Sequence, residues 1–480
     1  MNGINLHDVP LNASTRNKGM VLIMAMIFLV VFSSLAVAMA SFSDANLQVA
    51  VNLTEGKRAN ACAESGLETM RYWMDKVSFS GTVDTNLRMY AVSNSLNDAL
   101  DKGGVGTIRS HYLASYNCIV VPYVVKDSNE NEFFYGLMTQ PSTDALRLYV
   151  IGYHDSISRV LQVDYAFGQR ANSVFDYGVA TKGPLSLQGN VLLTGLNLAI
   201  ESNAYIESLS QALALYIKGN SQIGGNVKIA NPLGYVDLQG GQAGIGGETG
   251  QDAIDNHCSI GAPLENWPKP DPNYYEPYAI NVMDPNTDTA ADVNLVNIRI
   301  PAGLNPHFSG HADIKGVVFI EQPNVVTFTG NVDITGIIVT NGDWNDHSGT
   351  NQINITGNVS SASVSDLPEE SQFEDIREDT GVFMMAPGFS ASFGGSFSTL
   401  SGAIAANGIT FFGNAGGNIE GSVINYSDVL MDLSGNTDLY FNRSGLSEIP
   451  AGFVPQLVMQ YDAGSYSEVL SSDIIIHHVD

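Results

Sequence analysis

The feature that most constrains this chain of 480 residues is an apolar run near its N-terminus. From Met20 to Ala40 there is no charge, no proline and no glycine, and the only polar side chains are those of Ser33 and Ser34. As a helix rising about 1.5 Å per residue, this run is about 30 Å long, which matches the hydrocarbon core of a bilayer. We therefore expect a membrane-spanning helix, with Leu29 near its middle.

The helix is expected to continue well beyond the membrane run. Residues 44–77 contain no proline, and their apolar side chains recur close to helical spacing. These side chains are Leu47, Ala50, Val51, Leu53, Ala59, Ala63, Leu67, Met70, Trp73 and Met74. The pattern predicts one helix over residues 20–77, about 85 Å long, which is apolar all round in its first half and amphipathic in its second.

Two other interpretations of the apolar run stay open. The stretch "AVAMASFS" (36–43) has the small residues of a secretory cleavage site, so the run is also compatible with a signal peptide. It is equally compatible with a plain single-span anchor. A cleaved signal usually has a shorter apolar region, and the helical pattern that follows favours an anchor that stays attached.

Two short motifs flank the predicted membrane helix. "NKG" (17–19) precedes the apolar run, and an eight-residue element follows it, made of Ala61, Cys62, Ala63, Glu64, Ser65, Gly66, Leu67 and Glu68. Together they resemble the PilX-type N-terminal segment of the type IV pilin family, over about residues 16–76. The resemblance implies a prepilin-type leader at 1–19 and cleavage by a prepilin peptidase between Gly19 and Met20.

The resemblance also implies a place in the cell and a set of partners. The chain would be a single-pass protein of the inner membrane, in contact with lipid, with most of its length periplasmic or extracellular. Its partners would be other pilins or pseudopilins and the inner-membrane assembly machinery. Major pilins carry a glutamate where this chain has Met24. In lacking this glutamate, the chain resembles the minor pseudopilins found at filament tips.

Residues 78–170 predict a small α+β module. Residues 84–102 have a helical pattern, and four strand-like segments follow at 117–125, 131–139, 145–154 and 158–168. The last two alternate apolar and polar residues and are joined by a short turn, which predicts a hairpin with one buried face. An antiparallel sheet on the second half of a long helix is the layout that the pilin resemblance implies.

Residues 174–445 carry a repeated phrase beginning with Gly-Asn. "SGHADIKGVVFI" (309–320) and "TGNVDITGIIVT" (329–340) match almost position for position, 20 residues apart. This interval predicts a parallel β-helix with glycine and asparagine at its corners, interrupted by insertions at 262–285 and 365–381. A β-sandwich is the alternative, and residues 446–480 form a C-terminal tail. The expected fold class is thus mainly β, with a long N-terminal helix and a pilin-like sheet ahead of a β-solenoid.

The chemistry-bearing residues give little support to catalysis. With 49 acidic and 21 basic residues, the net charge of −28 disfavours nucleic-acid binding. The repeat region has few, scattered cations, and His311 becomes Asn331 in the repeat copy, so we expect no enzyme. Trp267 and the tyrosines of 262–285 fit sugar stacking, or capping of the solenoid edge.

One weak metal motif is present. Asp284, Asn286, Asp288 and Asp292 have the spacing of positions 1, 3, 5 and 9 of a calcium-binding EF-hand loop, although Thr289 and Leu295 replace its glycine and final glutamate. Calcium is the one cofactor that the sequence suggests. Three cysteines, Cys62, Cys118 and Cys258, allow at most one disulfide within the chain and do not fix its pairing.

The leading hypothesis is a non-enzymatic minor pilin or pseudopilin-like component of a type IV pilus or a type II secretion system. Its solenoid would serve assembly or surface binding. The alternative is a membrane-tethered β-helix protein that binds or cleaves polysaccharide, without a filament.

Overall fold

The structure is a computed structural model that describes residues 18–125, 132–195, 202–442, 449–470, 472 and 474. Most of the predicted leader and part of the predicted tail lie outside these ranges. The described chain forms two compact units. The first contains the described residues of Met1–Asp75, Leu96–Ala166 and Tyr461–Asp480, and the second contains those of Lys76–Ser95 and Phe167–Gln460.

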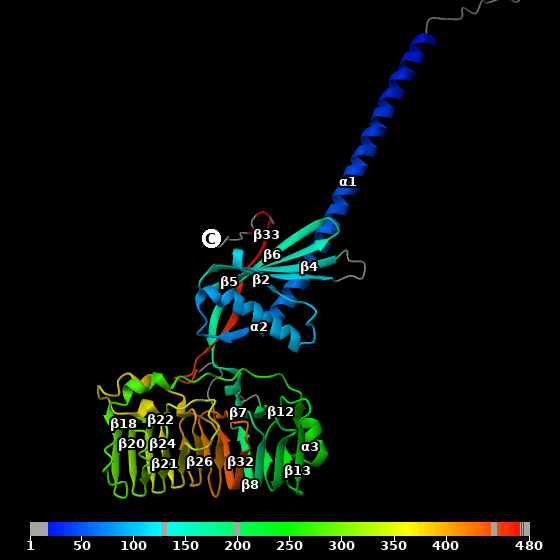
Figure 1. Ribbon diagram of the computed structural model, residues 1–480. Coiled ribbons are helices and arrows are strands. Elements are labelled where there is room, and N and C mark those ends of the chain that lie inside the picture. The colour runs from blue at the N-terminus through cyan, green and yellow to red at the C-terminus, as the bar shows by residue number, and fades with distance from the viewer. Residues whose placement is uncertain are drawn as a thin grey trace, which may run out of the picture. The chain divides into compact units, whose positions relative to one another are not determined.

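The predicted long helix is present as α1 (Lys18–Met74), which has 57 residues (Figure 1). The helix was predicted over residues 20–77, so it begins two residues earlier and ends three residues earlier than predicted. Its last backbone bond runs from Asp75 N to Arg71 O, at 3.0 Å. The elements that follow are β1 (Ser78–Ser80), the 3-10 helix η1 (Thr85–Leu87) and α2 (Arg88–Lys102).

The first unit contains the expected antiparallel sheet. Its strands are β2 (His111–Leu113), β3 (Cys118–Val125), β4 (Glu132–Ser142), β5 (Ala145–His154) and β6 (Ile157–Arg170), with η2 (Ala114–Tyr116) between β2 and β3. They pair in sequence order. The predicted hairpin is β5–β6, whose pairing closes at His154 and Ile157, and Asp155 in its turn has a positive φ of 48°.

One strand of this sheet comes from the predicted C-terminal tail. Residues Gln456–Val469 form β33, which lies beside β6 in the sheet order. Ser465 Oγ accepts a bond from Asp164 N at 2.7 Å, and the Tyr461 ring lies 5.7 Å from that of Tyr165. Residues 456–469 of the predicted tail are therefore a strand of the sheet. Because about 300 residues separate β33 from β6, no local sequence pattern indicates the pairing.

The second unit is a parallel β-solenoid with three faces. Its twelve-stranded sheet consists of β16 (Cys258–Ile260), β12 (Val227–Ile229), β9 (Ser202–Ile206), β7 (Tyr177–Thr181), β31 (Val423–Asn425), β28 (Ala403–Ala406), β25 (Val382–Ala386), β22 (Val332–Thr340), β20 (Ala312–Ile320), β18 (Val293–Ile300) and β17 (Asn281–Val282), with β24 (Val359–Ala362) beside β22. Residues 312–315, 332–335 and 359–362 begin a further face that continues in the second sheet.

The second, fourteen-stranded sheet forms one further face and continues the face that begins at residues 312–315, 332–335 and 359–362. Its main path is β15 (Glu248–Thr249), β14 (Gly244–Ile245), β11 (Gln222–Ile223), β8 (Leu185–Gly195), β32 (Met431–Phe441), β29 (Ile409–Phe411), β26 (Ser390–Phe393), β23 (Gln352–Ile355), β21 (Val325–Phe328) and β19 (His307–Phe308). β10 (Leu213–Gly219), β13 (Tyr235–Gln239), β27 (Thr399–Leu400) and β30 (Gly417–Ile419) branch from it. The parallel pairings exclude the β-sandwich alternative.

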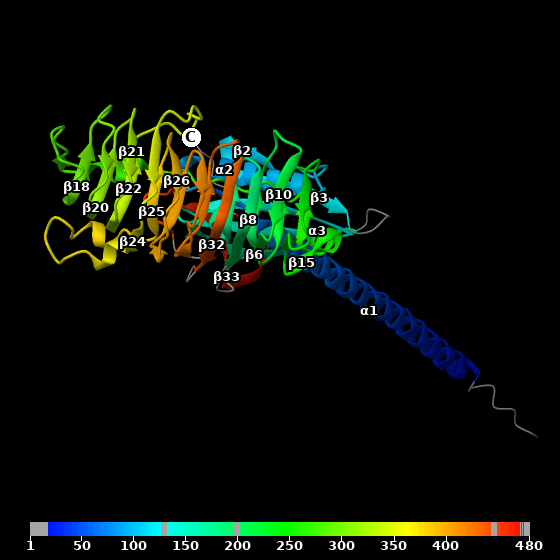
Figure 2. The same ribbon diagram turned by 90° about the horizontal axis from the view of Figure 1, so that it is seen from below.

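The order of the coils in space differs from their order along the chain. The last coil (β31 and β32) pairs with the first (β7 and β8), in a register that runs from Met431 opposite Leu185 to Phe441 opposite Gly195. The sequence pattern predicts consecutive coils and does not show this junction. Figure 2 shows the resulting single row, with β32 next to β8. Residues 262–285 are hereafter called the return segment. They run from the β16 end of the row to its opposite end, where they include β17.

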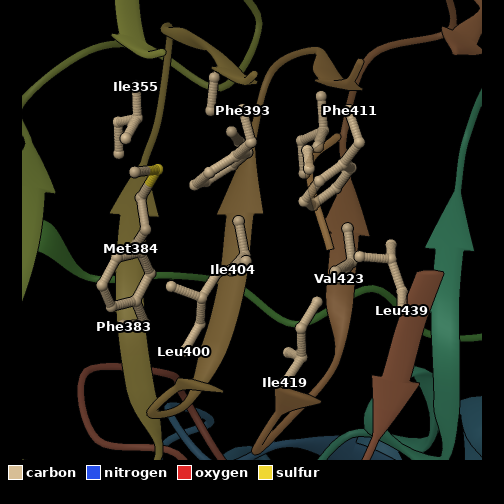
Figure 3. Packing of buried hydrophobic residues seen from close by; sticks show 14 of the residues in the cluster. Ile355, Phe383, Met384, Phe393, Leu400, Ile404, Phe411, Ile419, Val423 and Leu439 are labelled. Carbon is tan, nitrogen blue, oxygen red and sulfur yellow. The ribbon is translucent and has the colours of Figure 1, made fainter. Parts of the chain in front are cut away.

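Stacked side chains fill the inside of the solenoid. Figure 3 shows one row formed by Ile355, Phe393 and Phe411 on successive coils. The rings of Phe393 and Phe411 are stacked, with their centroids 4.9 Å apart. Identical positions on neighbouring coils bury similar apolar groups, so each coil adds a layer to one continuous core.

Glycine and asparagine occupy the corners, as the repeated phrase predicts. Gly310, Gly330 and Gly357 stack on successive coils, where a Cβ added to Gly330 would lie 1.9 Å from the carbonyl oxygen of Gly310. Asn436 Nδ2 donates to Asn414 Oδ1 of the next coil at 3.2 Å. The corner glycines are thus required by close backbone stacking.

Both predicted insertions pack on the outer face of the twelve-stranded sheet. The return segment contains η4 (Pro272–Tyr274) and η5 (Glu276–Tyr278), and residues 365–381, hereafter the acidic insertion, overlap η6 (Val364–Asp366) and contain η7 (Ile376–Glu378). Remaining elements are η3 (Ser173–Asp176) and α3 (Gly250–His257). Tyr275, Phe373 and Ile376 are fully buried in a second apolar cluster with residues of this sheet. The sheet is therefore covered on both faces.

Candidate membrane and assembly surface of the N-terminal helix

The N-terminal half of α1 is apolar and exposed along its whole length. Leu29 is 70% exposed and Phe42 is 71% exposed. The other large apolar side chains left open in this half are Met20, Val21, Leu22, Ile23, Met24, Met26, Ile27, Phe28, Val30, Val31, Phe32, Leu35, Val37 and Met39. In the next turns of the helix, Leu47, Val49, Val51 and Leu53 are exposed as well. The helix is long and apolar enough to cross a membrane, a property that an anchor and a signal sequence share.

The two hydroxyl groups within the apolar half bond to the helix itself. Ser33 Oγ donates to Val30 O at 3.1 Å, and Ser34 Oγ donates to Val31 O at 2.9 Å. A hydroxyl satisfied by its own backbone needs no water, so neither serine opposes burial in lipid or against another apolar helix.

The predicted processing point lies in the first turn of α1. Nothing is within 4 Å of a Cβ added to Gly19, and Met20 is 66% exposed. Ala40, at the other end of the predicted span, is also exposed. Residues 1–17 of the leader lie outside the described residues, and cleavage between Gly19 and Met20 stays a prediction.

The C-terminal half of α1 buries one face against β4 and β5 of its own unit. The buried positions follow helical spacing and are Ala59, Cys62, Ala63, Leu67, Met70 and Met74. Across from them, Met138, Leu148 and Val150 are also fully buried. These helix positions are therefore occupied within the chain and are not free to contact a neighbouring subunit.

The eight-residue motif places small residues where helix and sheet meet. A Cβ on Gly66 would lie 2.6 Å from the Phe134 ring and 2.7 Å from Val150 Cγ1. From the other side, a Cβ on Gly152 would lie 2.3 Å from the backbone nitrogen of Ala63. The local role of Ala63, Gly66 and the adjacent Leu67 is thus to let the helix approach the sheet closely.

Three other motif residues lie on the exposed side of the helix. Ala61, Glu64 and Glu68 are exposed. Asn60 Nδ2 donates to Glu64 Oε1 at 2.9 Å, and Glu68 forms an ion pair with Arg71 at 2.8 Å. The surface available to partners is therefore the apolar half of α1, followed by this polar stripe.

Sequence reasoning missed Gly152, which the structure makes central to the helix–sheet contact. The residue sits inside the predicted strand 145–154 ("ALRLYVIGYH"). An isolated glycine within a strand pattern often marks a close backbone approach, and that signal was available in the sequence.

The three cysteines form no disulfide in the part of the chain that the structure describes. Cys62 and Cys118 are buried in the first unit, and Cys258 is partly buried in the solenoid. Burial raises the pKa of the Cys118 thiol, and it raises the pKa of Cys258 to about 12. Both thiols are therefore held in their protonated, unreactive form at neutral pH.

The structure does not bring the four predicted calcium ligands together. Asp284 Oδ1 accepts from the backbone and side-chain nitrogens of Asn286 at 2.8 and 2.9 Å. Asp288 and Asp292 each accept from a different backbone amide, at 3.1 and 3.2 Å. Among the described residues, no three His, Cys, Asp or Glu side chains are grouped to hold a metal. Asp284 and Asp288 accept bonds within local turns, whereas Asp292 accepts one from His311, 19 residues further along the chain.

Three histidines of the repeat region, including His311, contact different neighbours. His307 Nε2 lies 2.9 Å from Thr329 Oγ1, and His311 Nε2 lies 3.4 Å from Asp333 Oδ2. His347 Nδ1 contacts the Asn407 side chain at 3.3 Å. The rings of Trp267 and Tyr275 pack within the solenoid unit, as part of the layer that covers the twelve-stranded sheet.

Comparison with solved structures gives a distant structural neighbour. No protein-family model matches the chain, and no curated protein sequence matches it. The chain is similar to the competence-associated pilin ComZ from Thermus thermophilus, with 14% sequence identity over 87% of this chain and 98% of that chain. The TM-score is 0.23, a level at which the likeness carries no argument about function.

Proposed function

We propose that this chain is a non-enzymatic minor pilin or pseudopilin-like component of a type IV pilus or a type II secretion system. It is held in the inner membrane by the first half of α1 before assembly, and its solenoid is displayed outside that membrane. Its partners are other pilins or pseudopilins, the inner-membrane assembly machinery and a prepilin peptidase.

The observation that carries this proposal is the contrast between the two halves of α1. One half is apolar and exposed on all sides, while the other buries one face against an antiparallel sheet. Lipid and the core of a helical filament are both apolar, so the exposed half suits either environment and can move from one to the other.

Processing gives the first test. N-terminal sequencing of protein extracted from membranes is expected to begin at Met20. Gly19→Leu, which blocks a peptidase that needs a small residue, is expected to leave the leader attached. Gly241→Leu, at an exposed glycine with no atom within 4 Å of the added Cβ, serves as a control. A mature N-terminus near Phe42 would identify a secretory signal and reject the pilin interpretation.

The place within the filament follows from Met24. In a filament shaft, a buried carboxylate at this position is thought to pair with the terminal amine of a neighbouring subunit. A subunit with no neighbour ahead avoids an unpaired buried charge by carrying methionine instead. We therefore assign the chain to the filament tip, in low copy number.

Immunogold labelling of sheared filaments tests the tip assignment. Label is expected at one end of a filament. Label spaced evenly along the shaft would reject the tip position. Label absent from all filaments, with the chain still in the membrane, would favour the alternative of a tethered β-helix that binds or cleaves polysaccharide.

A further inference from the structure

Three chain segments meet on the outer face of the twelve-stranded sheet. The return segment pairs with the loop at 449–453, where Asp271 N donates to Gly452 O at 2.7 Å. The same loop joins the acidic insertion, because Ala451 N donates to Thr380 O at 3.1 Å. Sequence positions that are far apart thus enclose one small region.

Aromatic side chains of the return segment surround one carboxylate of the acidic insertion there. Tyr274 OH donates to Asp379 Oδ1 at 2.6 Å. The Tyr274 ring meets the Tyr275 ring edge to face, with centroids 5.1 Å apart, and the Tyr278 ring lies 6.5 Å from it. Gly452 closes the far side, since a Cβ there would lie 2.5 Å from the Tyr275 ring.

Two buried oxygen atoms in this region have no hydrogen-bond partner among the residues that the structure describes. One is Asp379 Oδ2, in a residue that is 8% exposed, and the other is the hydroxyl of Tyr275, which is fully buried. The charge of Asp379 acts on Tyr275 and, with burial as the larger cause, raises the pKa of its hydroxyl. Buried oxygens are normally satisfied, so a pair of unsatisfied ones points to a shared missing partner.

The carboxylate of Asp379 forms no ion pair within the described ranges. The cation closest to it along the chain, Arg377, is paired with Glu369 at 3.7 Å. Burial raises the pKa of Asp379, and the charges of Asp375 and Glu378 add to this. An unpaired buried carboxylate is costly, and a bound cation would remove that cost.

We propose that a monovalent cation, Na⁺ or K⁺, binds between Asp379 Oδ2 and the Tyr275 hydroxyl and ties the return segment and the acidic insertion to the solenoid. Both atoms are oxygens, the ligand type that hard cations prefer. One carboxylate balances one positive charge, and the lack of a grouped acidic triad among the described residues disfavours a divalent ion. The site is independent of the proposed pilus role.

Thermal unfolding of the full chain in detergent tests the proposal. Samples in NaCl or KCl are compared with samples in N-methyl-D-glucamine chloride at equal ionic strength, because that cation is too large to enter. The small cations are expected to raise the Tm of the solenoid by about 2–4 °C. Hydrogen exchange is expected to slow in residues 269–278 and 376–382 and to stay unchanged in the first unit.

Two variants separate the site from a general salt effect. Asp379→Asn removes the charge, and Tyr275→Phe removes one oxygen while keeping the ring; both are expected to abolish the difference between small and large cations. Asp432→Asn, on the other sheet, is the matched control and keeps it. Equal Tm values in all three salts would indicate a bound water and overturn the proposal, as would stabilisation by CaCl₂ alone.

Discussion

The helix–sheet contact of the first unit and the coil–coil contact of the solenoid both depend on glycine, but in different ways. In the first unit, Gly66 and Gly152 are single positions that set how closely α1 approaches the sheet. In the solenoid, Gly310, Gly330 and Gly357 repeat the same corner on successive coils. A unique contact has no second copy to support it, whereas a repeated contact is one of several equivalent layers. Single changes should therefore be more damaging in the first unit.

The largest effect is expected from Gly152→Val. The new side chain would meet the backbone of Ala63, which cannot move without shifting α1 off the sheet. We expect a loss of about 4 kcal/mol in the free energy of unfolding of the first unit. Chemical denaturation of the detergent-solubilised chain, followed by hydrogen exchange in β4 and β5, measures it.

The matched control for this variant is Gly136→Ala on the neighbouring strand β4. A Cβ there would have its nearest contact at 3.5 Å, an ordinary packing distance. Little change is expected. Similar losses for the two variants would show that any side chain on this sheet is harmful, and that the close approach at Gly152 has no special role.

A smaller loss is expected from Gly330→Ala in the solenoid. Its Cβ would press on the Gly310 carbonyl, but the coil can adjust over several layers, so we expect about 2 kcal/mol. Gly241→Ala, with no atom within 4 Å of the new Cβ, is the control. If Gly330→Ala destabilised the chain more than Gly152→Val, repetition would offer no protection and the comparison would fail.

The pH dependence of the solenoid should include a contribution from Asp379. Burial raises the pKa of this carboxyl above its ordinary value, with Asp375 and Glu378 acting in the same direction and hydrogen bonds from Tyr274 and Tyr278 opposing it. The folded state therefore binds this proton more tightly than the unfolded state. The stability it contributes is present at low pH and is lost as the pH rises through the folded-state pKa.

Denaturation in N-methyl-D-glucamine buffers over that pH range measures this contribution. Asp379→Asn is expected to reduce the loss of stability with rising pH. At neutral pH the variant should be more stable than the parent chain, by a smaller free energy than Gly330→Ala costs. Asp432→Asn should leave the profile unchanged. If the stability of Asp379→Asn followed that of the parent chain at every pH, Asp379 would not be the cause of the pH dependence.

The smallest effect is expected from Asn436→Ala at a solenoid corner. The substitution removes an exposed hydrogen bond from the Asn436 side-chain amide to Asn414 of the neighbouring coil. This bond is worth about 0.5 kcal/mol. Asn418→Ala, an exposed asparagine on β30, is the control. A cost above about 2 kcal/mol would mean that the amide ladder, and not glycine stacking, holds these corners together.

The sequence predicts the parts of the fold that depend on nearby residues or on repetition. A local pattern in the sequence indicates the helix over residues 20–77, the hairpin with Asp155 in its turn and the stacking of Gly310 on Gly330. The pairing of β8 with β32 and of β33 with β6 leaves none, since the partners are hundreds of residues apart and their strands read like many others.

The apolar half of the candidate surface of α1 could be predicted, because a long run without charges can be identified from the sequence without knowing what it packs against. Its second half could not, because the amphipathic pattern does not say whether the apolar stripe meets the chain's own sheet or another subunit. The structure assigns Ala63 and Leu67 to the chain's own sheet. The orphaned oxygens of Asp379 and Tyr275 likewise depend on tertiary packing alone.

The junction between the first and last coils determines how the solenoid carries mechanical load. The backbone enters it near Asn172 and leaves it near Val454, and these two points are joined by a bond of 3.1 Å from Asn172 Nδ2 to Val454 O. If the chain is anchored as proposed, tension between the helix and the solenoid would be divided between these two adjacent backbone connections at the middle of the row. The coils at either end carry no chain connection to the anchor, so pulling on the helix would not unwind them from their tips.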